Sequence, residues 1–138
     1  MQVFTVGYED ASVDSFIAAL TRAGVKRVVD VRELPLSRRK GFSKTKLREV
    51  LAEHEIEYLH IRAAGNPYRD QKKNIALCLS NYRKHLDVTP EAVDEVERAI
   101  GPEPAALLCF ERDHHLCHRS VLARFLVARN PDLVLRHL

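Results

Sequence analysis

Short apolar runs alternate along this chain with segments in which apolar residues recur at helical spacing. Four of the runs predict strands, over Val3–Val6, Arg27–Val31, Ile56–Ile61 and Ala105–Phe110. Most of them carry little polar interruption, which is typical of strands buried on both faces of a parallel sheet. A fifth, shorter strand is predicted at Leu133–Leu135.

A helical pattern follows each of the first four strands. Apolar residues three or four positions apart predict helices from about 13 to 23, 44 to 51, 75 to 86, 90 to 100 and 118 to 129. Ser43 and Thr89 stand where their hydroxyls could cap two of these helices. Strands that alternate with helical crossovers favour a single-domain, three-layer α/β fold with a mostly parallel sheet of about five strands and helices on both faces.

Length and composition fit one domain over residues 1–138. The chain is 46% hydrophobic and 30% charged, with a net charge of +3, which is ordinary for a soluble globular protein and too small to indicate nucleic-acid binding by itself. No apolar segment reaches the length of a membrane span, and the first residues lack the charged lead of a signal peptide. We therefore expect a cytoplasmic protein with no membrane partner. Three cysteines form no disulfide framework, so reduced thiols are expected.

Ligands of open parallel sheets bind at the carboxyl ends of the strands. Side chains able to do chemistry follow the predicted strands at that edge, so we expect them to surround a common cavity. They are Tyr8, Asp30, Arg32, Glu111, Cys117, His118 and Arg119.

Asp30 lies inside the apolar run Val28–Val31. Burying a carboxylate without a partner is costly, so a guanidinium or backbone N–H groups should meet it, with Arg32 or Arg119 as the candidates. The pair could be a structural anchor, or Asp30 could take part in catalysis.

Glu111 and Cys117 are the two strongest candidates for reacting groups. Glu111 follows the most apolar strand and could serve as an acid, a base or a nucleophile, with Tyr8 orienting it or a substrate hydroxyl. Cys117 opens a helix, where the dipole and the neighbouring His118 and Arg119 would enrich the thiolate; it could equally be a packed small side chain. The catalytic candidates are thus Glu111, Cys117, Tyr8 and Asp30.

Anion binding is predicted at two places. Arg119 in the first turn of a helix adds a planar fork to the free N–H groups there. The loop Ser37–Lys44 combines cations with Phe42, a mixture that could hold a nucleotide or a nucleic-acid strand, or could be a solvated loop in which Phe42 is only a plug. The candidate anion-binding residues are Arg32, Ser37, Arg38, Phe42, His118 and Arg119.

A cluster of cysteines and histidines at 109–118 resembles a zinc site at first sight. The spacing of Cys109, His114, His115, Cys117 and His118 does not match a paired zinc-ligand arrangement, so we expect no metal and no cofactor. The spacing of a cysteine, five residues and an arginine that a phosphatase would use is absent as well.

Two functions remain open. The first is an enzyme that binds an anionic small molecule, phosphorylated or of nucleotide or nucleoside type, at the C-terminal edge of the sheet, with cleavage or transfer at a glycosidic bond as the reaction. The second is a nucleic-acid-binding module that uses the basic loop Arg38–Lys44 without catalysis. The oligomeric state is not predicted.

Several blocks of the sequence resemble the domain of unknown function 488 family, in the family's order. They are Thr5–Glu9; Val29–Arg32 with Pro35, Ser37 and Arg38; Gly41–Lys44 with Leu47; Ile56, Tyr58 and His60; Leu108–Glu111; and Cys117–Arg119. The resemblance implies a compact α/β domain in which these blocks form one pocket, and it implies no particular reaction. This chain has Ala63-Ala64-Gly65 where the family usually has Leu-Gly-Gly after the third strand.

Overall fold

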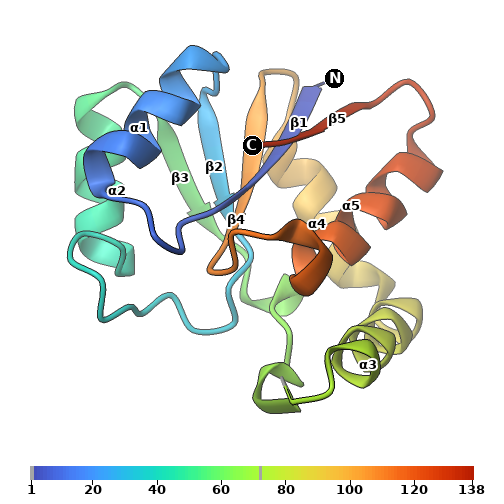
Figure 1. The fold of residues 1–138 in the computed structure, drawn as a ribbon. Coiled ribbons are helices and arrows are strands. Elements are labelled where there is room, and N and C mark those ends of the chain that lie inside the picture. Colours follow the sequence, from blue (N-terminus) through green and yellow to red (C-terminus); the bar gives the residue numbers. More distant parts are fainter. Residues whose placement is uncertain (1, 72) are drawn as a thin grey trace.

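The structure is a computed structural model that describes residues 2–71 and 73–138 (Figure 1). Its centre is a five-stranded parallel sheet with the order β3-β2-β4-β1-β5. This confirms the parallel α/β fold predicted above. The strands are β1 (Gln2–Gly7), β2 (Arg27–Asp30), β3 (Glu57–His60), β4 (Ala105–Cys109) and β5 (Val134–His137).

Helices cover both faces of the sheet, as Figure 1 shows. One face packs against α1 (Val13–Arg22) and α2 (Lys44–Glu53), and the other packs against α3 (Ile75–Val88), α4 (Pro90–Ile100) and α5 (His118–Arg129). Three short 3₁₀ helices lie between these elements: η1 (Arg62–Ala64), η2 (Arg69–Gln71) and η3 (His114–Leu116). The two apolar layers therefore sandwich the sheet and hide both of its faces from water.

The central strand β4 sets the position of the site. All of its residues are buried, and it pairs with β1 on one side and β2 on the other, with Gly7 opposite Cys109 and Asp30 opposite Leu108. The chain leaves β1 and β2 toward the helices of one face and leaves β4 toward α5 on the other face. Adjacent strands whose connections diverge in this way open a crevice at their carboxyl ends.

Gly7 permits a close approach at that edge. A Cβ atom at this position would lie 1.8 Å from the backbone oxygen of Glu111. The absence of a side chain therefore lets the segment after β4 lie directly against the end of β1.

Two of the predicted helix caps are wrong. Neither Ser43 nor Thr89 makes a side-chain cap hydrogen bond, although each is the N-cap residue of its helix. The hydroxyl of Ser43 instead bonds the backbone N–H and carbonyl of Ser37, which fixes the loop before α2. Ser12 forms a full capping box with Ser15 at the start of α1.

None of the helices formed by the described residues is both long and apolar enough to cross a lipid bilayer.

Candidate functional site

A cavity of about 490 Å³ lies at the C-terminal edge of the sheet, where the segments after β1, β2 and β4 meet α3. One part of its lining is apolar, with Leu34, Leu36, Ile75, Leu79, Phe110 and Leu116. The polar and charged part comprises Tyr8, Arg32, Glu33, Ser37, Arg38, Arg39, Asn66, Arg69, Glu111 and His118. A ligand with an apolar portion and a negative charge would find partners for both.

The floor of the cavity rests on a buried ion pair between Asp30 and Arg32. The Arg32 side chain donates from Nε to Asp30 Oδ1 at 2.9 Å and from Nη2 to Oδ2 at 2.7 Å, and Asp30 also accepts from the Tyr58 hydroxyl. Asp30 is fully buried and Arg32 is 5% exposed. The sequence-based expectation that a guanidinium meets Asp30 is confirmed, with Arg32 as the partner.

This network fixes protonation states. Burial acts to lower the pKa of Arg32, but the hydrogen bonds and charge of Asp30, with Tyr8, outweigh it and raise that pKa above its ordinary value. Burial and the neighbouring Asp30 charge raise the pKa of Tyr58. The arginine is therefore permanently charged and the tyrosine permanently neutral, which suits an anchor more than a proton donor.

Tyr8 lines the cavity, and its ring stacks on that of Phe42 behind it. Their ring centroids are 4.6 Å apart, and Arg32 Nη1 donates both to the Tyr8 hydroxyl at 3.3 Å and to the Phe42 carbonyl at 2.7 Å. Phe42 is buried and is not part of the lining, whereas Tyr8 is. The basic loop is thus pinned to the domain through its one aromatic ring.

Three further arginines supply positive charge to the cavity. Arg38 and Arg39 come from the loop between β2 and α2, and Arg69 comes from η2. Arg39 donates to the Ala11 carbonyl, and Arg69 lies 3.7 Å from the Glu33 carboxylate. Arg38 is exposed and makes no hydrogen bond or ion pair with another described residue. Its guanidinium can turn toward a ligand at little cost.

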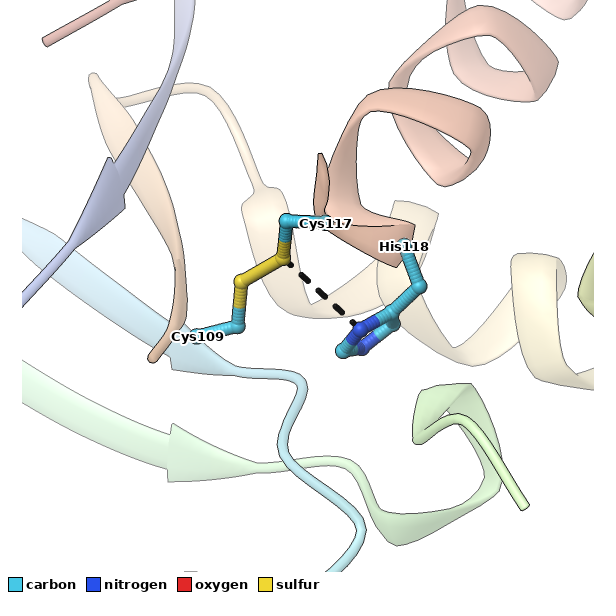
Figure 2. A group of neighbouring side chains, drawn as sticks. All are labelled: Cys109, Cys117 and His118. Atoms are coloured by element: carbon cyan, nitrogen blue, oxygen red, sulfur yellow. Dashed lines mark hydrogen bonds between the residues drawn. A yellow bond between two sulfur atoms is a disulfide. The ribbon is translucent and has the colours of Figure 1, made fainter. Parts of the chain in front are cut away.

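The cysteines differ from the sequence-based expectation of reduced thiols. Cys109, at the end of β4, and Cys117, just before α5, form a disulfide (Figure 2). The expectation was wrong because residues eight apart in sequence meet when the strand end and the helix start converge on the same edge. Cys78, in α3, is buried and free, as expected for a reduced thiol.

Glu111 lies beside this disulfide. Its Oε2 atom is 3.7 Å from Cys109 Sγ, and its side chain is part of the cavity lining. A carboxylate on the wall of a cavity rich in arginine can act on a bound molecule as an acid or a base.

Arg119 is fully buried and binds the backbone of the segment after β4 from the side that faces away from the cavity. Its guanidinium donates to the backbone carbonyls of Glu111 and Arg112 and lies 3.1 Å from Cys109 Sγ. Burial lowers the pKa of Arg119 to about 10, although Glu111 and Asp113 act to raise it. The group stays charged at neutral pH, and it positions Glu111 without lining the cavity.

His118 connects α5 to the segment after β2. Its Nε2 atom hydrogen-bonds the Val31 carbonyl at 2.7 Å, and its ring meets Tyr82 edge-on. A carbonyl only accepts, so the Nε2 atom carries the proton and Nδ1 is the basic nitrogen, 3.8 Å from Cys117 Sγ. Figure 2 shows this contact as a dashed line.

One group in the described part of the chain brings metal-type ligand atoms together. The sulfurs of Cys109 and Cys117 and a ring nitrogen of His118 lie within 4.8 Å of one another. The two sulfurs are bonded to each other, however, and metal ligation by cysteine requires thiolates. The disulfide form is therefore not a metal site.

The ten predicted site residues divide into two layers. Tyr8, Arg32, Ser37, Arg38, Glu111 and His118 line the cavity. Asp30, Phe42, Cys117 and Arg119 lie behind it as supports.

Sequence reasoning missed six polar or reactive residues in the lining, namely Glu33, Arg39, Asn66, Arg69, Cys78 and Cys109. Arg39 and Glu33 directly follow the predicted site residues Arg38 and Arg32 in the loop after β2. Their positions were a sequence signal by which the predicted site could have been extended. Arg69 and Cys109 also line the cavity, although neither was among the predicted site residues. The rule that selected residues just after each strand does not reach Arg69, which follows β3 by nine positions.

A family model described as Domain of unknown function DUF488 matches residues 12–126. The chain belongs to this family. The matched part contains both arginine-bearing loops, Glu111 and the two bonded cysteines of the DUF488 domain, while Tyr8 precedes it. No curated protein and no solved structure matches the chain.

Proposed function

We propose that this DUF488 protein is an enzyme that binds an anionic small molecule in the cavity at the C-terminal edge of its sheet. The observation that carries the proposal is the lining itself, in which Arg38, Arg39 and Arg69 share one cavity with the Glu111 carboxylate and a set of apolar side chains. Guanidinium groups bind phosphate and carboxylate with paired hydrogen bonds, and apolar walls suit a base or another flat ring.

The nucleotide or nucleoside class fits this combination. Such a molecule has an anionic end for the arginines and an apolar ring for Leu36, Ile75 or Leu79. The cavity, at about 490 Å³, falls in the size range of small-molecule sites.

The proposed reaction is cleavage or transfer at a glycosidic bond. Such chemistry uses two carboxylates, one as acid and one as nucleophile or base. Asp30 is bound by Arg32 and Tyr58 and does not line the cavity, so Glu111 and Glu33 are the two carboxylates of the cavity lining. In this proposal Glu111 is the acid or nucleophile and Glu33 its partner.

Binding is tested by isothermal titration calorimetry with nucleoside monophosphates and with inorganic phosphate. The double variant Arg38→Ala, Arg39→Ala should lose at least about 100-fold in affinity, since each of the two charged hydrogen bonds contributes roughly 1.5–3 kcal/mol. The variant Arg22→Ala, Lys46→Ala removes the same charge outside this cavity and should bind like the wild type. Equal affinity in all three proteins would contradict the proposal.

Catalysis is tested by chromatographic detection of free base released from nucleosides and nucleotides. Glu111→Gln should keep binding and lose turnover, while Glu103→Gln, outside the cavity, should keep both. Full turnover in Glu111→Gln would remove Glu111 from the reaction.

The nucleic-acid alternative gives a different result in the same assays. Its affinity for single-stranded oligonucleotides would fall steeply with salt, and mononucleotides would not bind. That outcome would replace the enzymatic proposal.

A further inference from the structure

We propose that Cys109 and Cys117 form a redox-active pair that exchanges with low-molecular-weight thiols entering through the cavity, with Cys109 as the sulfur attacked and Cys117 as the sulfur released. The proposal concerns chemistry at the disulfide and stands apart from the glycosidic reaction above.

The two sulfurs differ in access. Both residues are 1% exposed, but Cys109 is part of the cavity lining and Cys117 is not. Figure 2 shows the disulfide running from the end of β4 to the start of α5. A small thiol in the cavity therefore meets Cys109 first.

Cys117 is built to leave as a thiolate. It is the N-cap residue of α5, and its sulfur accepts the backbone N–H of Arg119 at 3.5 Å. The positive end of a helix dipole and a donated N–H both favour a negative sulfur. A leaving thiol with a low pKa departs faster in exchange reactions.

His118 supports the return reaction. Because its Nε2 hydrogen-bonds the Val31 carbonyl, the basic Nδ1 faces Cys117 at 3.8 Å. This nitrogen can take the proton of a Cys117 thiol before the thiolate attacks a mixed disulfide on Cys109.

The surroundings of Cys109 suit the attacked sulfur. Arg119 Nη1 lies 3.1 Å from Cys109 Sγ and can stabilise charge there, while Glu111 Oε2 at 3.7 Å can receive the proton of the incoming thiol. Both groups are held in place, since Arg119 binds the backbone carbonyl of Glu111.

The thiol–disulfide exchange takes place in two steps. A thiolate attacks Cys109 Sγ, a new S–S bond forms, the Cys109–Cys117 bond breaks, and Cys117 takes the electron pair. A second thiolate then attacks the external sulfur of the mixed disulfide and releases Cys109 as a thiolate. In sum two thiols are oxidised to one disulfide, and the protein disulfide is reduced to two thiols by two electrons.

The test uses glutathione and its disulfide in buffer containing a chelator, followed by alkylation and peptide mass spectrometry. The Cys117→Ser variant lacks the second sulfur, so glutathione disulfide should trap one glutathione on Cys109. In Cys109→Ser, Cys117 should react at least about tenfold more slowly because it does not line the cavity. Cys78→Ser should exchange like the wild type.

Three results would overturn the proposal. They are glutathione on Cys117 in preference to Cys109, a native disulfide that glutathione reduces only after unfolding in urea, and two free thiols even in excess glutathione disulfide. Should a serine variant fail to fold by circular dichroism, the wild type remains informative, because the mixed disulfide formed during its reduction maps to one cysteine or the other.

The test is separable from that of the proposed function. The exchange is therefore repeated with cysteamine in place of glutathione, because cysteamine carries no anionic group and its exchange with the disulfide does not require Arg38 or Arg39. Loss of nucleotide binding and loss of exchange are therefore independent results.

Discussion

Replacing Asp30 with alanine should remove the foundation of the site and much of the stability of the domain. The substitution leaves the Arg32 guanidinium at 5% exposure without its two charged hydrogen bonds of 2.9 and 2.7 Å. The backbone N–H of Arg32 and the Tyr58 hydroxyl lose the same acceptor. Removing one partner of a buried pair costs about 3–5 kcal/mol, because a charge remains buried without compensation.

The expected loss in Asp30→Ala is large relative to the total free energy of unfolding of a domain. Native domains are stable by roughly 5–15 kcal/mol, so Asp30→Ala should take away a third or more of the free energy of unfolding of an average domain. An exposed pair offers a matched control, since Arg27 and Glu57 also join β2 to its surroundings, and the Glu57 side chain is 66% exposed. Glu57→Gln should cost less than about 1 kcal/mol.

Urea unfolding followed by far-ultraviolet circular dichroism measures both variants. Asp30→Asn removes the charge and keeps the shape of the side chain, so its free energy of unfolding should lie between those of the wild type and Asp30→Ala. A loss in Asp30→Ala no greater than that in Glu57→Gln would refute the reasoning, because the pair would then contribute no more than a surface contact.

Three further perturbations follow from the same structure. Gly7→Ala would place a Cβ 1.8 Å from the backbone oxygen of Glu111 and should lower the free energy of unfolding in urea by about 1–3 kcal/mol or more. Gly24 has open space around it and a φ of +75°, so Gly24→Ala should cost only the strain of the left-handed backbone, about 1–2 kcal/mol. Ser12→Ala removes the capping box of α1 and should cost about 1 kcal/mol; an unchanged denaturation midpoint would show that the cap contributes nothing. Burial and neighbouring positive groups lower the pKa of His114 and of His137, whose rings stack at 3.5 Å. The unfolded chain therefore binds more protons than the folded one below the ordinary histidine pKa of 6.5, so the thermal midpoint should fall from pH 7.5 to 5.5. Replacing both histidines with glutamine should flatten that dependence, and a midpoint that rises on acidification would contradict it.

The fold could be predicted because its local signals agree. The apolar runs and helical periods each indicate one kind of element, and their alternation leaves a parallel sheet as the simple solution. The order of the strands could not be predicted, since nothing in a local pattern says that β4 inserts between β1 and β2.

The site was harder because burial and exposure at a strand end depend on packing. Asp30 and Arg32 are two residues apart and point to a pair, yet only the structure shows that Tyr58 completes it and that Asp30 lies behind the cavity. Arg119 looked like an anion-binding group from its helix start, and the structure places it against the backbone carbonyls of Glu111 and Arg112. The disulfide was missed because a bond between two cysteines depends on three-dimensional proximity, which spacing alone does not give.

The central claim is that the arginine-lined cavity receives an anionic ligand. The most direct measurement is an amide chemical-shift titration of the ¹⁵N-labelled protein with nucleoside monophosphates. At ligand concentrations up to about 1 mM, the titration detects binding free energies of roughly −4 kcal/mol or stronger. The account predicts shifts concentrated at Ser37–Arg39, Arg69 and Phe110–Glu111, all in the cavity lining. Shifts confined to the faces of α1 and α2, or no shifts at about 1 mM ligand, would contradict it.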